Sequence, residues 1–201
     1  MEIVFWILFS FLFYTYVGYG LFLTLAALFF KPKKIVREDF FPAVTFIVPA
    51  FNEEEFIEAK IQNSLALDYP AEKLHFVFVT DGSTDKTESI VRRYPKINLL
   101  HHHEREGKAS AINRAMQDIK TPLVVFSDAN TAVHPGSIKR LVQHFSNEKV
   151  GGVSGEKQIA KEVPFVNAGE RLYWQYESWL KKANAQFFTL VGAAGELFAI
   201  R

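Results

Sequence analysis

The chain lacks cysteine: none occurs among its 201 residues. A disulfide, a zinc–thiolate site and a thiol nucleophile are therefore excluded. The chain also lacks an excess of basic charge, since 23 Lys and Arg balance 22 Asp and Glu to a net charge of +1. Nucleic-acid-binding proteins usually carry a concentrated basic patch, so we expect no nucleic-acid partner. Disorder is excluded as well, because hydrophobic residues make up 49% of the chain.

Two glycine-rich nucleotide-binding patterns are also missing. The sequence has no G-x-G-x-x-G after its first predicted strand and no G-x-x-x-x-G-K-[ST]. Their absence argues against a dehydrogenase and against a P-loop enzyme. A nucleotide diphosphate can still be bound without these loops, through a divalent ion held by oxygen ligands.

No charged residue occurs from Ile3 to Phe30. A run of this length exceeds the roughly 20 residues that a helix needs to cross a membrane. A signal peptide is the first alternative, but Glu2 precedes the run where a positive charge is expected, and no small-residue cleavage site ends it. A buried core helix is the second, although one without a polar face is unusual in so small a domain. We predict a transmembrane helix over residues 1–30.

A cluster of positive charge follows this helix and comprises Lys31, Lys33, Lys34 and Arg37. No Lys or Arg precedes the helix, so the positive-inside rule places the rest of the chain in the cytoplasm. We expect residues 31–43 to form a basic juxtamembrane linker and residues 44–201 to form one domain at the cell membrane.

From Val44 onward, short apolar strands alternate with helices of about ten residues. This alternation predicts an α/β fold with a doubly wound, mostly parallel sheet flanked by helices. Strands are expected over Val44–Pro49, Leu74–Thr80, Ile97–Leu100, Leu123–Ser127 and Val150–Val153. Helices are expected after Asn52 and over Lys86–Arg93, Lys108–Ile119, Gly136–His144 and Glu170–Asn184, the last aromatic and amphipathic. Asn52 and Glu55 are predicted to form a capping box for the first of these helices.

Polar residues follow each of the first four predicted strands, at the sheet edge where ligands of parallel sheets bind. They are Asn52–Glu54, Asp81–Asp85, His101–His103 with Arg105 and Lys108, and Asp128–Thr131. Each group has a local alternative, such as a helix cap or a turn. The three adjacent histidines alternate between opposite faces of a strand and are not expected to share one ion. Asp128 can supply an oxygen ligand to Mg²⁺ or Mn²⁺, and Asn130 a weaker carbonyl oxygen.

Four motifs in order carry a family resemblance: Val48–Glu54, Asp81–Asp85, Gly107–Asn113 and Ser127–Thr131. Their order and spacing resemble family 2 glycosyltransferases of the GT-A fold across nearly all of residues 44–201. The apolar N-terminal run and the Gly192–Arg201 segment are similar to the membrane-embedded branch that includes poly-N-acetylglucosamine, hyaluronan and cellulose synthases.

The resemblance implies a role for each matching residue. It implies that the nucleoside pocket is lined by Pro49, Ala50, Asn52 and Glu53. It implies that Asp81 hydrogen-bonds the base, usually uracil, that Lys108 lies near the nucleotide, and that Asp128 and Asn130 hold Mn²⁺ or Mg²⁺ and the diphosphate. The implied donor is a UDP-sugar, and the implied acceptor is a hydroxyl of a glycan or lipid.

The sequence departs from the family pattern at three places. Thr80 stands where many relatives have an Asp before Asp81, and Asn130 replaces the second Asp of the metal motif. The family's general base, in a Thr-Glu-Asp-type motif, and its Gln-x-x-Arg-Trp motif are expected beyond Arg201, together with further membrane spans. We therefore expect these 201 residues alone to be inactive in transfer.

The predicted function is inverting glycosyl transfer from a nucleotide sugar in cell-envelope or exopolysaccharide synthesis. Two alternatives stay open. The chain can be a module that binds the donor without transferring it. It can also be a nucleotidyltransferase, which shares the sheet type and the metal chemistry but usually has a glycine-rich loop after its first strand, where this chain has Pro49-Ala50-Phe51-Asn52-Glu53.

Overall fold

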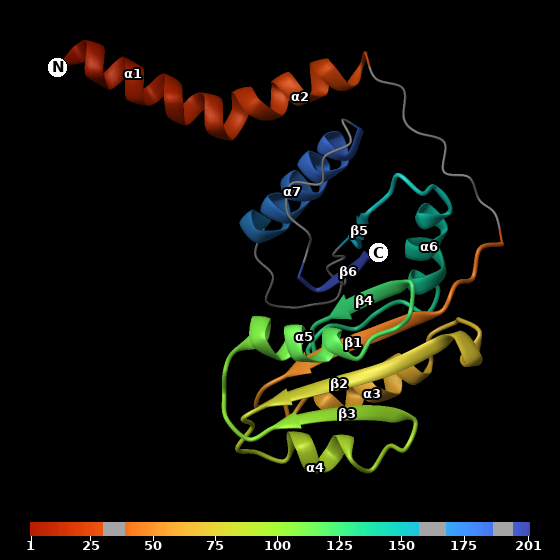
Figure 1. Cartoon of the computed structure of the whole chain (residues 1–201). Coiled ribbons are helices and arrows are strands. Elements are labelled where there is room, and N and C mark those ends of the chain that lie inside the picture. The colour runs from red at the N-terminus through yellow and green to blue at the C-terminus, as the bar shows by residue number, and fades with distance from the viewer. Residues whose placement is uncertain (30–38, 157–167, 187–194) are drawn as a thin grey trace. The chain divides into compact units, whose positions relative to one another are not determined.

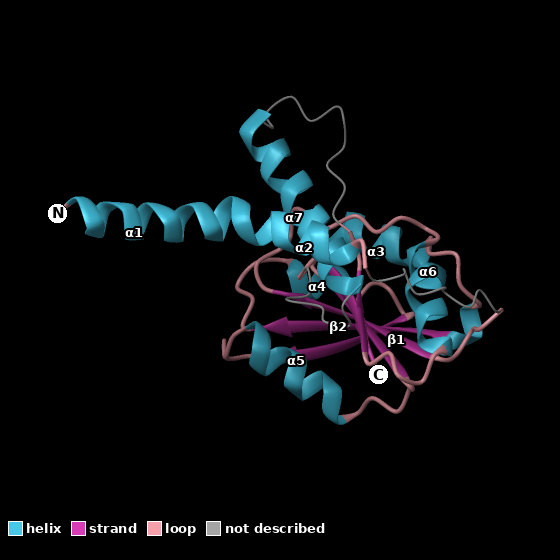
Figure 2. Cartoon of the chain, turned by 90° about the horizontal axis from the view of Figure 1, so that it is seen from above, coloured by secondary structure: helices cyan, strands magenta, loops and turns pink. Residues whose placement is uncertain are grey.

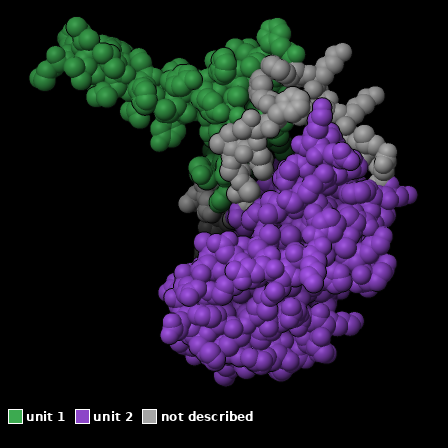
Figure 3. Space-filling view, in the orientation of Figure 1, with its two compact units in different colours: residues 1–34, 157–192 green, residues 35–156, 193–201 purple. Residues whose placement is uncertain are grey.

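The computed structural model describes residues 1–29, 39–156, 168–186 and 195–201. It divides into two units: residues 1–34 with 157–192, and residues 35–156 with 193–201 (Figure 3). The basic cluster from Lys31 to Arg37 lies outside the described residues, as does the start of the Gly192–Arg201 segment.

The second unit is built on a six-stranded sheet with the strand order β3-β2-β1-β4-β6-β5 (Figure 1). The strands are β1 (Val44–Ala50), β2 (Leu74–Asp81), β3 (Ile97–His102), β4 (Leu123–Ser127), β5 (Gly152–Ser154) and β6 (Leu197–Ile200). The strands β1 to β4 pair in parallel, whereas β6 runs antiparallel to both β4 and β5. The prediction of a mostly parallel sheet is therefore confirmed.

Helices cover both faces of this sheet (Figure 2). The helices α3 (Ile57–Leu65), α4 (Thr87–Val91) and α6 (Ser137–Gln143) pack in one core with alternate side chains of the strands, including Phe46 and Phe78. The helix α5 (Lys108–Gln117) packs on the opposite face against Ile47, Val77 and Val79. Short 3-10 turns occupy Ala71–Lys73 and His144–Ser146. Because both faces are buried, the central strands consist of continuous apolar runs rather than alternating ones.

The strand β6 was not predicted. It inserts between β4 and β5, and the ring of Phe198 stacks on that of Phe126 with centroids 4.6 Å apart. The strand has only four residues, and its partners are separated from it by more than forty positions along the chain. No local sequence pattern reports such a long-range pairing.

The predicted capping box at Asn52 is wrong. The helix α3 begins only at Ile57, after Phe56, and no side-chain hydrogen bond caps it. Asn52 instead adopts a φ of 53°, and its side-chain Oδ1 accepts a hydrogen bond of 2.9 Å from the Thr84 N–H. The asparagine therefore braces the loop after β1 against the turn after β2.

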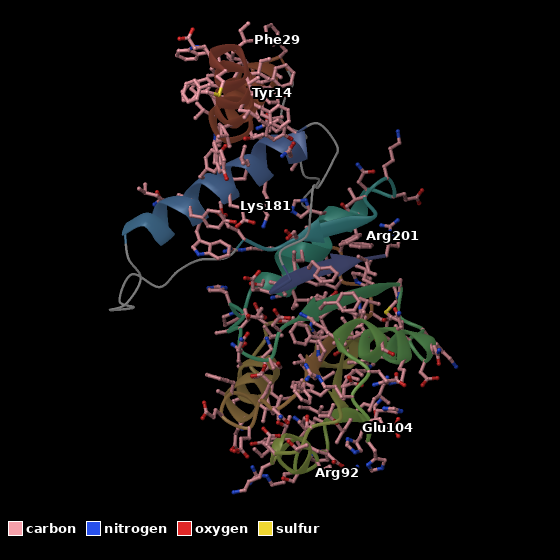
Figure 4. All side chains as sticks on the ribbon, turned by 90° about the vertical axis from the view of Figure 1, so that its left-hand side faces the viewer. Tyr14, Phe29, Arg92, Glu104, Lys181 and Arg201 are labelled. Atoms are coloured by element: carbon pink, nitrogen blue, oxygen red, sulfur yellow. The ribbon has the colours of Figure 1, made fainter. Side chains whose placement is uncertain are left out.

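The first unit contains a long apolar helix and an aromatic one. Residues Glu2–Ala27 form α1 (Glu2–Phe13), a π-helical turn (Tyr14–Gly18) and α2 (Tyr19–Ala27). This 26-residue stretch has a mean hydropathy of 1.6 and is long and apolar enough to cross a membrane. Side chains such as Tyr14 within this stretch and Phe29 just after it are exposed (Figure 4), unlike those of a core helix.

The aromatic helix α7 (Ala168–Gln186) confirms the predicted helix in this part of the chain. It packs on the apolar helix through Gly20, where an added Cβ would come within 2.7 Å of the Trp179 ring. The Tyr176 hydroxyl donates a hydrogen bond of 2.6 Å to the Tyr16 carbonyl. A side chain at position 20 would therefore separate the two helices.

Candidate nucleotide-binding site

A polar cleft of about 260 Å³ lies at the carboxyl ends of β1, β2 and β4. Its lining comprises Pro49, Ala50, Phe51, Glu53, Asp81, Arg105, Gly107, Lys108, Ala111, Asp128, Ala129 and Asn130. Every residue that the sequence predicts for binding lies in this lining except Asn52, which is engaged with the turn after β2. The fold thus brings residues from all four motifs to one place.

Asp81 is buried, with 4% of its surface exposed, and organises the loop on one side of the cleft. Its Oδ2 accepts hydrogen bonds of 2.9 and 2.7 Å from the N–H groups of Glu106 and Gly107. Its Oδ1 accepts a hydrogen bond from Arg114, which is also its ion-pair partner. Burial alone raises the pKa of Asp81, but these hydrogen bonds outweigh it and hold the pKa below its ordinary value.

Gly82 allows the loop after β3 to approach β2. Its φ is 67°, and an added Cβ would lie 2.6 Å from the Arg105 backbone nitrogen. This approach places the Arg105 guanidinium 3.9 Å from the centroid of the Phe51 ring, where the two form a cation–π contact. Phe51 and Arg105 were not among the predicted binding residues, although both stand inside or beside the motifs that identified the site.

A Gly82→Ala substitution is expected to lower the free energy of unfolding by about 2 kcal/mol, because it adds left-handed strain to a backbone clash. Gly136→Ala is the matched control, since its Cβ would meet only ring atoms at ordinary contact distance and its φ is −81°. Urea unfolding of both variants checks the prediction. Equal stability of the two variants would contradict the close approach of the loop.

Asp128 follows β4 directly and forms an ion pair with Lys108, the first residue of α5. Both residues line the cleft. Glu53 lies on the same cleft, and its pKa is raised by burial and then by the negative charges of Asp128 and Asp85. Glu53 and Asp128 thus place two carboxylates on the lining of one cleft, close enough for the charge of Asp128 to act on Glu53.

The residues at Asp128 fit a divalent ion of the Mg²⁺ or Mn²⁺ type. Both Asp128 and Asn130 line the cleft and offer hard oxygen atoms. Among the described residues, no three His, Asp or Glu side chains are placed together as a metal site. A diphosphate and water would therefore supply most of the ligands, as is usual for Mg²⁺ at phosphate sites.

The three histidines at the end of β3, of which His101 and His102 lie in the strand, do not converge on one point. The Nε2 atom of His101 lies 3.2 Å from Nδ1 of His103, and its other ring nitrogen contacts the Thr80 hydroxyl at 2.9 Å. His102 points elsewhere and is hydrogen-bonded to the Glu104 carbonyl at 2.7 Å. This geometry agrees with the expectation from strand alternation.

A mostly parallel sheet with a polar cleft at its strand ends is the architecture of a nucleotide-binding α/β domain. Residues 45–201 match the family model described as "Glycosyl transferase family 2". The chain belongs to glycosyl transferase family 2, and its fold is GT-A.

Individual relatives support this assignment. Over 131 residues the chain is 30% identical to poly-beta-1,6-N-acetyl-D-glucosamine synthase of Staphylococcus aureus (strain COL). The matched region covers 63% of this chain and 31% of the relative. Over 182 residues it is 28% identical to beta-monoglucosyldiacylglycerol synthase of Nostoc sp., covering 86% of this chain and 38% of the relative. The chain thus spans about a third of the length of these curated relatives.

Among solved structures, the chain resembles mannosyltransferase PcManGT from Pyrobaculum calidifontis, in complex with GDP-Man and Mn²⁺. The TM-score is 0.78 and the identity 29%, over 93% of this chain and 53% of that chain.

Proposed function

We propose that this chain provides the donor-binding half of an inverting glycosyltransferase. The enzyme moves a sugar from a nucleotide sugar, a UDP-sugar in this proposal, to a hydroxyl of a glycan or lipid in the cell envelope or an exopolysaccharide. The observation that carries the proposal is the convergence of Asp81, Lys108 and Asp128 on one cleft.

The proposed roles follow from the chemistry of the cleft. The nucleoside lies against Pro49 and Ala50, with its base toward Asp81. The diphosphate lies between Asp128 and the N-terminal end of α5, which no side chain caps and where Lys108 and the helix dipole favour an anion. When bound, Mn²⁺ or Mg²⁺ neutralises charge on the diphosphate leaving group. Asp128 and Asn130 are the residues that would hold it.

The acceptor side of the reaction requires a general base to take the proton from the attacking hydroxyl. The Thr-Glu-Asp-type and Gln-x-x-Arg-Trp motifs do not occur in these 201 residues. We therefore assign no catalytic base here. A module that binds the donor without transferring the sugar is the alternative function. Membership of family 2 disfavours the other alternative, a nucleotidyltransferase.

The nucleobase of the sugar donor is identified by offering labelled UDP-GlcNAc, UDP-glucose and GDP-mannose as donors. GDP-mannose belongs in the panel because the structurally similar mannosyltransferase was solved with it. Transfer is compared between these 201 residues and the product of the whole gene. We expect the whole product to use a UDP-sugar and the 201 residues to transfer at least about 100-fold more slowly, the usual cost of losing a general base. Similar turnover by both would show that the base lies within residues 1–201.

The apolar helix Glu2–Ala27 is proposed to span the cell membrane with the GT-A domain in the cytoplasm. Because the chain is free of cysteine, one Cys at a time can be introduced. In intact cells, a membrane-impermeant maleimide is expected to label Glu2→Cys but to label Glu148→Cys only after permeabilisation. Labelling of Glu148→Cys from outside would reverse the proposed topology.

A further inference from the structure

Lys60 is a buried lysine on α3 that the proposed chemistry does not use. Only 2% of its surface is exposed, and it stands among Ile57, Ile61 and Ser64 on the buried face of the helix. Lysine is rarely buried to this extent without a partner for its ammonium group. Its presence on an otherwise packed face therefore requires a physical reason.

The contacts of the Lys60 ammonium group supply that reason. The Nζ atom donates a hydrogen bond of 2.6 Å to Ser127 Oγ and another of 2.7 Å to the Thr131 carbonyl oxygen. Ser127 immediately precedes Asp128, and Thr131 immediately follows Asn130. One side chain thus holds both ends of the segment that carries the two proposed metal ligands.

A second residue on the same helix extends this support. The Asn63 side chain donates a hydrogen bond of 2.8 Å to the Val133 carbonyl and accepts one of 2.8 Å from the Val133 N–H. The Ser127 hydroxyl in turn donates a hydrogen bond of 2.9 Å to the Glu196 carbonyl, just before β6. The helix α3 therefore fixes the chain that leaves β4 at several successive points.

The charge of Lys60 acts on the same segment. Burial lowers the pKa of Lys60 to about 8, while the negative charge of Asp128 opposes this shift. Both hydrogen-bond acceptors are neutral oxygens, so Asp128 is the anionic group that stabilises the buried ammonium. The group is therefore mainly charged at neutral pH.

We propose that Lys60 is a positioning residue, which holds the Asp128–Asn130 segment in the conformation that binds the metal–diphosphate group. The inference rests on the proposed function, because it assumes that Asp128 holds the ion. Lys60 itself touches neither donor nor metal in this proposal. Groups that orient metal ligands typically change metal affinity about 10- to 100-fold when they are removed.

The test uses the 201-residue chain in detergent micelles, with UDP at a saturating concentration. It measures the affinity of the chain for Mn²⁺ and the melting temperature of the chain. The variant Lys60→Met approximately keeps the side-chain volume and removes the buried charge with its two hydrogen bonds. We expect its Mn²⁺ affinity to fall about 10- to 100-fold. Ile61→Val is the matched control, because it weakens the core contact of the neighbouring residue on the same helix and leaves the Asp128–Asn130 segment untouched.

Three results would overturn the inference. The first is a Mn²⁺ affinity of Lys60→Met within about twofold of wild type, far from the expected loss. The second is an equal loss in Ile61→Val, which would trace the effect to stability. If Lys60→Met does not fold, the Mn²⁺ affinities of Lys60→Gln and Ser127→Ala are measured in its place, and an affinity within about twofold of wild type again overturns the inference.

The third result is wild-type binding of UDP that needs no metal. It would end the proposed metal role of Asp128 and this inference together, whereas the first two leave the proposed function intact.

Discussion

The Asp128→Ala variant is expected to lose metal-dependent binding of UDP, with an apparent affinity at least about 100-fold below that of wild type. Asp128 is the carboxylate that lines the cleft directly after β4 and offers the ion its charged oxygen. Its removal also releases Lys108 from the ion pair. Residual binding should therefore be weak, insensitive to chelator and dependent on Lys108. Fluorescence competition with Mn²⁺ or EDTA measures both components.

Asn130→Asp is the matched variant for this prediction. It restores a second carboxylate to a site built from oxygen ligands, so Mn²⁺ affinity should be preserved or increased. A loss of affinity in Asn130→Asp, or wild-type affinity in Asp128→Ala, would show that the ion does not bind at this segment.

Asp81→Ala is expected to lower the free energy of unfolding by about 2 kcal/mol, because it leaves Arg114 and two backbone N–H groups without their acceptor. This cost lies below the range for fully buried ion pairs because the Arg114 side chain is 27% exposed. Asp118→Ala, an exposed position at the end of α5, is the control and should change stability by less than about 0.5 kcal/mol.

The contribution of Asp81 also depends on pH. The pKa of Asp81 lies below its ordinary value of 3.8 in the folded chain, so the unfolded chain binds more protons between the two values. The stabilisation by Asp81 is fully present above the ordinary pKa of the unfolded chain. It is lost as the pH falls through the lower pKa that Asp81 has in the folded chain. Urea midpoints of wild type and Asp81→Ala should therefore converge on acidification from pH 6 to pH 3. A constant difference would contradict the hydrogen-bonded carboxylate.

The sequence predicted the central sheet well because the information there is local. Continuous apolar runs such as Leu123–Ser127 predict strands buried on both faces, and the polar residues after them necessarily reach one edge. That edge is where Asp81, Lys108 and Asp128 meet. The roles of these residues came from the resemblance of the ordered motifs to a known family, because the spacing of strands and helices does not assign them.

The errors and omissions involve contacts between distant residues. Asn52 has the composition of a helix cap, but its side chain is engaged by Thr84, more than thirty residues away. The pairing of β6 likewise depends on β4 and β5 rather than on its own four residues. Lys60 did carry a local signal, since it occupies a buried position in the spacing of Ile57 and Ile61. A lysine at such a position indicates a polar partner in the core.

Calorimetric titration of the 201-residue chain with UDP, in Mn²⁺ and again in EDTA, tests the central claim most directly. The account predicts saturable binding of one UDP per chain in Mn²⁺, its loss in EDTA, and weaker binding of GDP. Binding of UDP that is unchanged by EDTA, or no binding of either nucleotide in Mn²⁺, would contradict a metal-dependent donor site at Asp128.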